Sequence, residues 1–135
     1  MFTASCLCRS VSFEISSPLS EARYCHCENC RKFSGTGSAP WAITELKSLN
    51  VTSVAAPINK YQSGGGTRCF CNTCGSPLWF ESKLNPAKVA IPLGVIDSGD
   101  VPKPQSHIWT QSCPVWYDIP DNLEQFTTNP YYTNG

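Results

Sequence analysis

The fold of this chain depends on the segment Cys71-Asn72-Thr73-Cys74-Gly75 and on a second pair, Cys6-Leu7-Cys8. The two-residue gap lets both sulfurs reach one metal ion, and Gly75 allows a turn in which backbone N–H groups approach them. The one-residue gap of the second pair requires only a bend in the backbone. Four thiolates at about 2.3 Å in a tetrahedron form a closed, structural zinc site. Such a site would tie the N-terminus to the middle of the chain.

Two other interpretations apply to these four cysteines. They could be buried free thiols, which pack like small apolar side chains. Cys71 and Cys74 could instead form a redox pair, although that motif usually begins a helix and here Gly75-Ser76-Pro77 leads into a strand pattern. Two compact pairs in one short chain favour metal binding.

A second cluster, Cys25-His26-Cys27-Glu28-Asn29-Cys30, supplies only three thiols at ligand spacing. Zinc with three protein ligands keeps its fourth position for water or a substrate, which distinguishes a catalytic site from a structural one. A substrate thiolate suits that position because zinc binds soft sulfur well. The ring of His26 should point away from the metal in an extended segment. In the alternative interpretation, Cys69 or Cys113 completes a second structural site.

Composition limits the class of protein. The 135 residues suffice for one domain, which we expect over 1–135, with a core at about 5–126 and a tail at 127–135. The formal net charge is zero, which argues against nucleic acid or an anionic membrane as a partner. No segment approaches the roughly 20 apolar residues of a membrane span, and no signal peptide is visible. We therefore expect a cytoplasmic protein whose nine cysteines stay reduced, with the clustered ones binding metal and not forming disulfides.

Alternation of apolar and polar residues predicts a mainly β fold with long loops. The segment 11–15 alternates in this way and indicates a half-buried strand. Further strands are expected at 40–44, 49–53, 58–62, 67–70, 77–81, 89–93 and 106–109. A short helical turn is expected to begin near Glu28. The aromatic piece 115–126 should pack back on the sheet, and Tyr131 and Tyr132 could dock as well.

Several segments together match the pattern of a known family. They are Cys6-Leu7-Cys8 followed by 11–14, the cluster and its continuation over 25–32, Ser34-Gly35, the run 68–78, His107-Ile108-Trp109 and the run 116–119. In this order, and over Ser5 to about Phe126, the chain resembles the glutathione-dependent formaldehyde-activating (GFA) family of carbon–sulfur lyases.

The resemblance implies a β-tent of antiparallel sheets stabilised by zinc. It implies two zinc ions, a structural one on Cys6, Cys8, Cys71 and Cys74 and a catalytic one on Cys25, Cys27 and Cys30. It also implies a small thiol, such as glutathione, or a glutathione conjugate as partner, and formation or cleavage of a carbon–sulfur bond, as in an S-hydroxymethyl thiol. The chain departs from the family where many relatives carry a basic residue shortly before the late Trp-Tyr pair, because here the run is Gln111-Ser112-Cys113-Pro114-Val115.

Other residues are candidates for contact with a substrate. Arg31 and Lys32 could bind the carboxylates of a glutathione-like thiol, or lie on a solvated helix face. Arg68 could pair with an acid near the pocket, or cover a strand edge. His107 is a candidate general base, or a hydrogen-bonded structural histidine. The glycine-rich loop 63–66 is expected to be a mobile turn and a candidate lid.

Three functions compete at this point. The leading hypothesis is a zinc-dependent enzyme that acts on a thiol adduct. The second is a non-catalytic, zinc-stabilised binding module, which four-sulfur coordination at both metals would favour. The third is a thiol redox or metal sensor, because clustered thiolates oxidise and release zinc. The sequence leaves the oligomeric state open.

Overall fold

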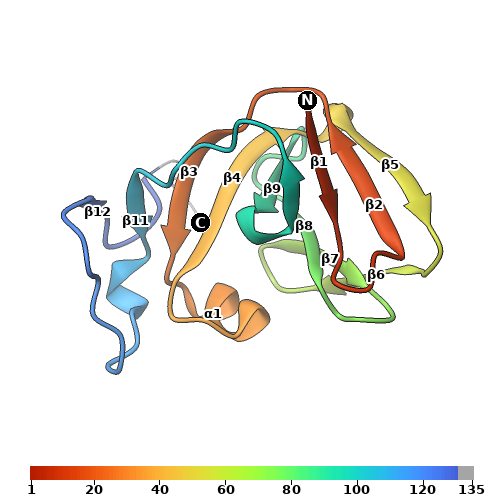
Figure 1. The fold of residues 1–135 in the computed structure, drawn as a ribbon. Helices are drawn as coiled ribbons and strands as arrows, with labels where there is room; N and C mark the ends of the chain where they lie inside the picture. Colours follow the sequence, from red (N-terminus) through yellow and green to blue (C-terminus); the bar gives the residue numbers. More distant parts are fainter. Residues whose placement is uncertain (131–135) are drawn as a thin grey trace.

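The computed structural model describes residues 1–130, which form two β-sheets, one short α-helix and three 3₁₀ turns (Figure 1). The strands are β1 (Phe2–Ser5), β2 (Val11–Ile15), β3 (Ser20–Cys25), β4 (Ala39–Glu45), β5 (Leu49–Val54), β6 (Ile58–Gln62), β7 (Gly66–Cys71), β8 (Pro77–Ser82), β9 (Lys88–Pro92), β10 (Ile96–Ser98), β11 (Ser106–Ile108) and β12 (Glu124–Gln125). The helix α1 spans Glu28–Ser34, and the turns η1, η2 and η3 span Leu46–Ser48, Leu93–Val95 and Thr110–Ser112.

The strands form a small and a large sheet. The small sheet has the order β10-β1-β2-β5, and the large sheet has the order β12-β11-β3-β4-β9-β8-β7-β6. All pairs are antiparallel except those that β11 makes with β3 and β12, which are parallel. This confirms the mainly β, antiparallel tent expected for the chain.

Strands with clear alternation lie where the sequence predicts them. The structure reproduces the segments 11–15 and 58–62 residue for residue, and shifts the ends of other predicted strands by a single residue. The sequence pattern did not predict β1, β3, β10 or β12. In β3 the residues Ser20-Glu21-Ala22-Arg23 have weak strand propensity, and Glu21 has a φ of 50° where the pairing with β4 shifts register. Residues 20–25 therefore form a strand because they pair with β4 and β11, and not because of their own propensity.

The main core lies between the small sheet and one face of the large sheet. Its largest fully buried side chains include Phe13, Ile15, Leu78 and Ile91. The rings of Phe13 and Trp79 meet edge to face with centroids 5.4 Å apart. Complete burial of each such side chain stabilises the fold by roughly 1.5–3 kcal/mol, so this core holds the two sheets together.

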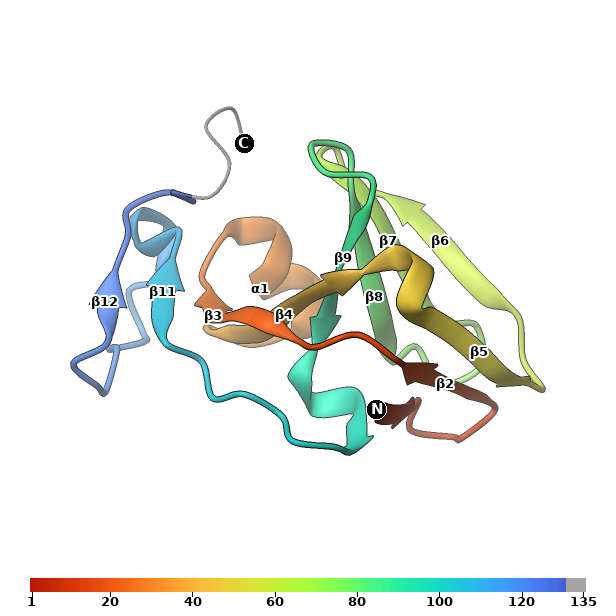
Figure 2. The same ribbon diagram turned by 90° about the horizontal axis from the view of Figure 1, so that it is seen from above.

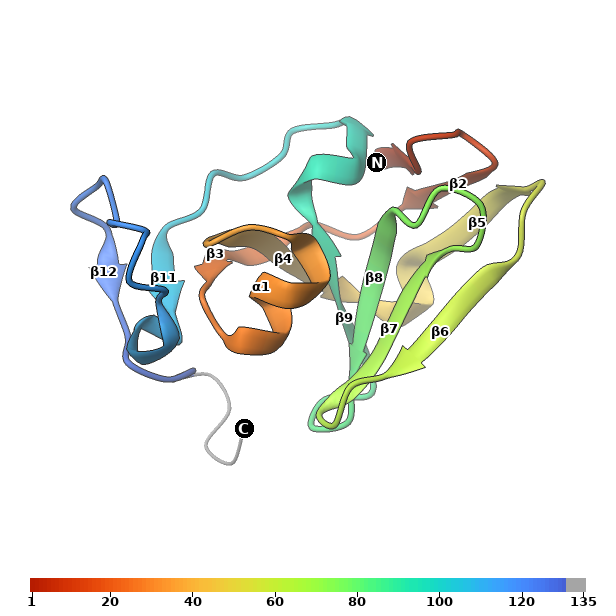
Figure 3. The same cartoon turned by 90° about the horizontal axis from the view of Figure 1, so that it is seen from below.

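The second face of the large sheet carries a smaller apolar cluster around Cys25, Cys30, Trp41 and Ile108. Side chains on a strand point alternately to opposite faces. Thus Trp41 belongs to this second cluster whereas its neighbour Ala42 belongs to the main core. Figures 2 and 3 both place α1 on this side of the fold, between β11 and the strands β8 and β9.

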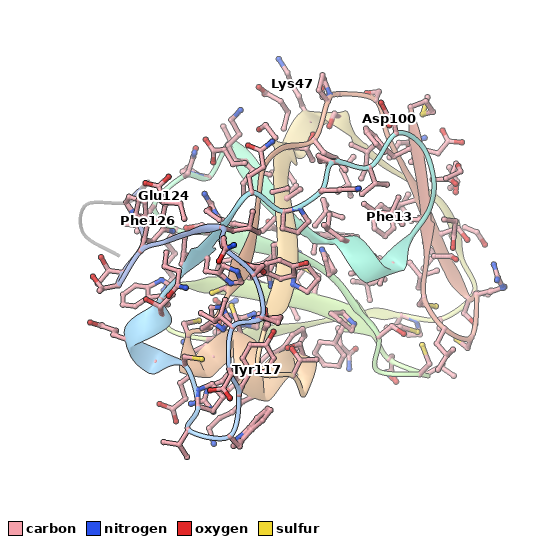
Figure 4. All side chains as sticks on the ribbon, turned by 60° about the vertical axis from the view of Figure 1, so that its left-hand side comes forward. Phe13, Lys47, Asp100, Tyr117, Glu124 and Phe126 are labelled. Atoms are coloured by element: carbon pink, nitrogen blue, oxygen red, sulfur yellow. The ribbon has the colours of Figure 1, made fainter. Side chains whose placement is uncertain are left out.

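The C-terminal piece packs back in part. β12 adds to the edge of the large sheet beside β11, and Phe126 packs against the second apolar cluster. Figure 4 shows Tyr117 beside α1, and its ring lies 5.9 Å from that of His26, whereas the neighbouring Val115 and Trp116 are exposed. The predicted docking of Tyr131 and Tyr132 lies outside the described residues. Within residues 1–130, no helix has the length and apolar character required to cross a membrane.

Candidate metal centres

The first centre brings together Cys6, Cys8, Cys71 and Cys74, whose sulfur atoms all lie within 4.8 Å of one another. The Sγ atom of Cys8 lies 3.6 Å from that of Cys6 and 3.8 Å from that of Cys71. Four sulfurs at about 2.3 Å from one zinc ion in a tetrahedron are about 3.8 Å apart. The spacing of these atoms therefore fits a tetrahedral zinc ion.

Two tight backbone turns build this first centre. After β1, the Arg9 N–H donates to Cys6 O (3.0 Å), and the Val11 N–H lies 3.4 Å from Cys6 Sγ. After β7, the Gly75 N–H donates to Cys71 O (2.9 Å), and Gly75 adopts a φ of 77° that only glycine takes readily. Donors that face sulfur stabilise a thiolate.

Ser76 connects the two turns. Its hydroxyl accepts from the Leu7 N–H at 3.0 Å and lies 3.2 Å from Cys74 Sγ. The hydrogen bond with this hydroxyl is the largest of the effects that lower the pKa of the Cys74 thiol, to about 5. Since Cys6 follows the small sheet and Cys71 ends a strand of the large sheet, a metal here would cross-link the two sheets.

The second centre brings together Cys25, Cys27 and Cys30, again with all sulfur atoms within 4.8 Å of one another. Cys25 ends β3, Cys27 is the N-cap of α1 and Cys30 lies in the first turn of that helix. Cys27 Sγ accepts from the Cys30 N–H at 3.2 Å, where an N-cap oxygen would normally accept. One change of direction, from strand to helix, therefore gathers all three sulfurs.

The second centre favours a thiolate at Cys27. The neighbouring thiols of Cys25 and Cys30 lower the pKa of Cys27 to about 3, and the Cys30 N–H and the Arg68 guanidinium act in the same direction against burial. Hydrogen bonds with the thiols of Cys27 and Cys30 raise the pKa of Cys25 in turn. An anionic, preformed set of sulfurs is what a soft divalent cation binds.

A cavity of about 430 Å³ opens onto the second centre, and its lining includes all three of these cysteines. None of the four cysteines of the first centre lines it. Its apolar wall includes Trp41, Phe80 and Trp109, and its cationic residues are Arg23, Arg68 and Lys88. Of the two centres, the second therefore borders this cavity and the first does not.

The cavity lies on one face of the large sheet. Ile43, Ala90, Phe80 and Arg68 are direct partners across β4, β9, β8 and β7, and all four line the cavity. Trp41 follows two residues away from Ile43 on the same face. The register of four strands therefore delivers Arg68 to a site whose cysteines come from β3 and α1.

The structure separates Arg31 and Lys32 from the cavity lining. Lys32 is exposed and lies 3.9 Å from the Glu28 carboxylate, one helical turn away, and Arg31 is half-buried. Neither residue lines the cavity. A role for them in substrate binding stays a prediction, whereas Arg68, for which the sequence left two alternatives, lies inside the site.

Two buried histidines hold the segment between Cys25 and Cys27. His26 Nδ1 lies 2.8 Å from Gly37 O, and His26 Nε2 lies 2.8 Å from His107 Nδ1. His107 Nε2 in turn lies 2.9 Å from Asp121 Oδ1. Both ring nitrogens of His26 therefore have partners other than the sulfurs. The backbone N–H of His26 donates to Ile108 O at 3.0 Å.

The two ends of this chain of hydrogen bonds are acceptors. A backbone carbonyl and a carboxylate only accept, so the three bonds between them need three protons on two imidazole rings. Two neutral rings carry only two protons, so one of the three contacts lacks a proton when both rings are neutral. Burial lowers the pKa of His26. No local sequence pattern indicates that His26 and His107 meet.

Cys69 and Cys113 join neither cluster within the described residues. Cys69 is fully buried in the main core, and its thiol donates to Glu81 Oε2 at 3.4 Å. Burial is the main cause that raises the pKa of Cys69 to about 12. Cys113 is half-buried and donates to Tyr117 O at 3.5 Å. Neither cysteine therefore lies in position to be a fourth ligand of the second centre in this structure.

Two further parts of the cavity wall come from loops. Ser63 and Gly65, in the predicted glycine-rich loop, line the cavity, and Gly65 O accepts from the Lys83 N–H at 3.0 Å. Trp109 lines it from the other side in a left-handed conformation, with a φ of 57°. Such a conformation costs a non-glycine residue about 1–3 kcal/mol and is frequent at binding sites.

Known proteins resemble this chain in sequence and in fold. The family model described as glutathione-dependent formaldehyde-activating enzyme matches residues 1–112. A protein of Schizosaccharomyces pombe named as an uncharacterized lyase is 26% identical over 80 residues, which cover 58% of this chain and 56% of that relative. The chain thus spans little more than half the length of the curated relative it matches.

A crystal structure of a Rhodobacter sphaeroides protein has a similar fold. The TM-score is 0.61 at 25% identity, and the match covers 73% of this chain and 90% of the other. With the family match over residues 1–112, the four-cysteine centre and the three-cysteine centre on a cavity, this chain belongs to the glutathione-dependent formaldehyde-activating enzyme family.

Proposed function

We propose that this protein is a zinc-dependent enzyme that forms or cleaves a carbon–sulfur bond in an adduct of a small thiol, such as an S-hydroxymethyl thiol. Cys25, Cys27 and Cys30 would hold the catalytic zinc, and Cys6, Cys8, Cys71 and Cys74 the structural one. The observation that carries the proposal is that the three-cysteine centre lines the cavity whereas the four-cysteine centre does not.

The cysteines of the second centre suit a fourth ligand from solution. When bound there, zinc supplies a position for a soft thiolate and polarises an oxygen attached to the adduct. The described residues offer no fourth cysteine to this group. A cavity of this size encloses a molecule of the size of a small peptide thiol, since ligand pockets range over roughly 300–1,000 Å³.

The chain's own residues prepare the cavity for an anionic sulfur. Arg68 Nη2 lies 4.0 Å from Cys30 Sγ and supplies a fixed positive charge beside the sulfurs. Trp41, Phe80 and Trp109 contribute apolar surface to the cavity. Arg68 itself is only 5% exposed, and low exposure to water strengthens the electrostatic interactions of its charge. The family and the name of the S. pombe relative support a lyase reaction.

The test compares the wild-type protein with Cys27→Ser. We expect two zinc ions per wild-type chain and one in the variant, with a similar thermal unfolding midpoint. Wild-type protein should accelerate the exchange between glutathione, formaldehyde and S-hydroxymethylglutathione, measured by NMR with ¹³C-formaldehyde, and Cys27→Ser should abolish the acceleration. Cys113→Ser, a cysteine outside both centres, is the matched control and should retain it.

X-ray absorption at the zinc edge separates the enzyme from a binding module. An enzyme should show an average sulfur coordination below four that rises when glutathione is added. Full four-sulfur coordination of both metals without any added thiol would contradict the proposal and favour a non-catalytic module.

A further inference from the structure

Two aromatic residues of the cavity wall, Phe80 and Trp109, lie beside the cysteines of the second centre. Both side chains are half-buried, so part of each is accessible, and both line the cavity. Both also pack against the apolar cluster that contains Cys25 and Cys30. Accessible aromatic surface next to metal ligands contributes nothing to the binding of the metal, so it is available to a bound molecule.

The backbone places Trp109 next to the sulfurs. Ile108 is the direct partner of Cys25 across the parallel pair of β11 and β3, and Trp109 is the next residue. Its left-handed conformation, with a φ of 57°, turns the chain at this point. The Thr110 N–H then donates to Phe126 O at 3.1 Å and fixes the turn. Non-glycine residues keep such a conformation where their surroundings enforce it, and they do so most often at ligand sites.

Phe80 approaches the sulfurs from the sheet. It is the direct partner of Arg68 across β7 and β8, and the Arg68 guanidinium carbon lies 4.7 Å from the centroid of its ring. Arg68 Nη2 in turn lies 4.0 Å from Cys30 Sγ. The Phe80 ring is therefore separated from Cys30 by a single side chain, whereas Trp109 follows the residue that pairs with Cys25.

The cations around the cavity offer little to any charged group of a ligand other than its sulfur. Arg23 and Arg68 are only 4% and 5% exposed. Lys88 Nζ lies 3.3 Å from the Glu45 carboxylate. Leu84, by contrast, lines the same cavity and is 51% exposed. The accessible wall near the second centre thus favours an apolar group on the bound molecule.

Of the two halves of a thiol adduct, the carbonyl half suits this apolar surface. Glutathione, the thiol in the description of the family, carries amide and charged groups close to its sulfur. The carbon that becomes bonded to sulfur carries the substituent of the carbonyl compound, which in formaldehyde is only hydrogen. An apolar substituent on that carbon would pack against Phe80 and Trp109, and removal of its surface from water is favourable.

We propose that the carbonyl compound handled at this site is an aldehyde with an apolar substituent, and that Phe80 and Trp109 determine this specificity. The inference rests on the proposed function and names the class of its carbon substrate. In the forward reaction the thiol sulfur bonds to the carbonyl carbon, the C=O π bond opens and the thiol proton ends on the oxygen. Cleavage is the reverse of this step, and neither direction needs an oxidant or a reductant.

The experiment keeps glutathione as the thiol and varies the aldehyde. Acetaldehyde and isovaleraldehyde differ by one isopropyl group, and saturation-transfer NMR follows their exchange with the glutathione thiohemiacetal on zinc-loaded protein. Each kcat/KM is divided by the uncatalysed rate constant of the same aldehyde. We expect the corrected value to be roughly tenfold to a hundredfold higher for isovaleraldehyde. Calorimetry should show tighter binding of S-isopentylglutathione than of S-methylglutathione, two thioethers that mimic the adducts without reacting.

Variants of the two aromatic residues test their role in this preference. Trp109→Ala and Phe80→Ala should each lower both ratios several-fold, with zinc content determined for every protein. If Trp109→Ala loses zinc, Trp109→Phe keeps a ring of smaller area and should still lower the ratios by a smaller factor. Trp116→Ala is the matched control, because Trp116 is exposed and does not line the cavity, and it should leave both ratios unchanged.

The outcomes separate this inference from the proposed function. A wild-type ratio close to one, acceleration with formaldehyde alone, or a ratio that no variant of Phe80 or Trp109 lowers would overturn the inference and leave the carbon–sulfur reaction intact. If the zinc-loaded protein accelerates the reaction of none of the three aldehydes, the proposed function fails, and this inference fails with it.

Discussion

The two cysteine centres use the same ligand in different surroundings. The four cysteines lie in two turns that connect strands of different sheets, and backbone N–H groups and serine hydroxyls surround their sulfurs. The three cysteines lie at a junction of strand and helix, with a buried cation, aromatic rings and a cavity around them. Ligand type alone therefore does not distinguish the roles of the centres.

The difference lies in what holds each centre in place. The first centre depends on local turns and would itself join the sheets. The second is held by side chains from distant parts of the sequence, His107, Asp121 and Arg68 among them. When other side chains already hold the three cysteines in place, the fold does not need a fourth protein ligand on the metal. Such a centre can leave one coordination position to a ligand.

The largest expected effect follows from loss of the first centre. Cys71→Ser removes one of its four thiolates. Structural zinc contributes roughly 10–16 kcal/mol in small peptides, and a typical domain has a net stability of about 5–15 kcal/mol. We expect Cys71→Ser to lack a cooperative thermal transition at 37 °C and above, measured by circular dichroism, whereas Cys27→Ser unfolds cooperatively.

Cys69→Ser is the matched control, because Cys69 is equally buried on the same strand but belongs to neither centre. It should retain its zinc and lose only about 1–2 kcal/mol, as expected for a polar substitution in a core. A Cys71→Ser protein that melts cooperatively within a few degrees of wild type would contradict the structural role of the first centre.

An intermediate effect is expected at His107. His107→Leu removes the partner of both His26 Nε2 and the Asp121 carboxylate, and it should lower the free energy of unfolding by about 2 kcal/mol. Since the lost bonds hold the segment between Cys25 and Cys27, zinc should leave the second centre faster, while the first centre releases it at the wild-type rate. Zinc release to a colorimetric chelator, followed together with urea unfolding, measures both quantities.

His107→Gln serves as the conservative variant, because an amide can still donate and accept. We expect it to recover part of the lost stability and of the zinc retention. Unchanged release of zinc from the second centre in His107→Leu would show that the histidine pair supports the fold and not the centre.

The sequence predicts which cysteines group together because ligand spacing is local. The gaps between Cys25, Cys27 and Cys30 and between Cys71 and Cys74 span at most one turn of backbone, and the structure gathers the corresponding sulfurs into two groups. The alternating segments likewise lie in strands. Local pattern and local geometry agree in these places.

The remainder of the site depends on contacts between distant residues. Arg68 reaches the cavity through the register of β7, β8, β9 and β4, and no short segment encodes that register. The contact between His26 and His107 joins residues 81 positions apart. Arg31 and Lys32 are candidates because they follow Cys30 in sequence, yet neither residue lines the cavity.

The smallest expected effect concerns the two cysteines outside the centres. The thiolate is the form that reacts with iodoacetamide. Burial raises the pKa of Cys69 to about 12, and its S–H donates to Glu81, so Cys69 stays protonated between pH 7 and 9. Cys113 is half-buried, so part of its surface is accessible.

We therefore expect mass spectrometry of the native, zinc-loaded protein to find Cys113 labelled slowly and Cys69 unlabelled over this pH range. The raised pKa also sets the sign of a stability change. The folded state favours the neutral thiol, so its contribution is complete below pH 9 and is lost as the pH rises from 9 toward 12. Cys69→Ala should flatten this alkaline loss of stability, by at most about 1.4 kcal/mol per pH unit. Labelling of Cys69 at pH 7 in protein that retains two zinc ions would mean that the main core opens while both centres stay closed, and it would contradict the expectation that the first centre helps the core to hold the sheets together.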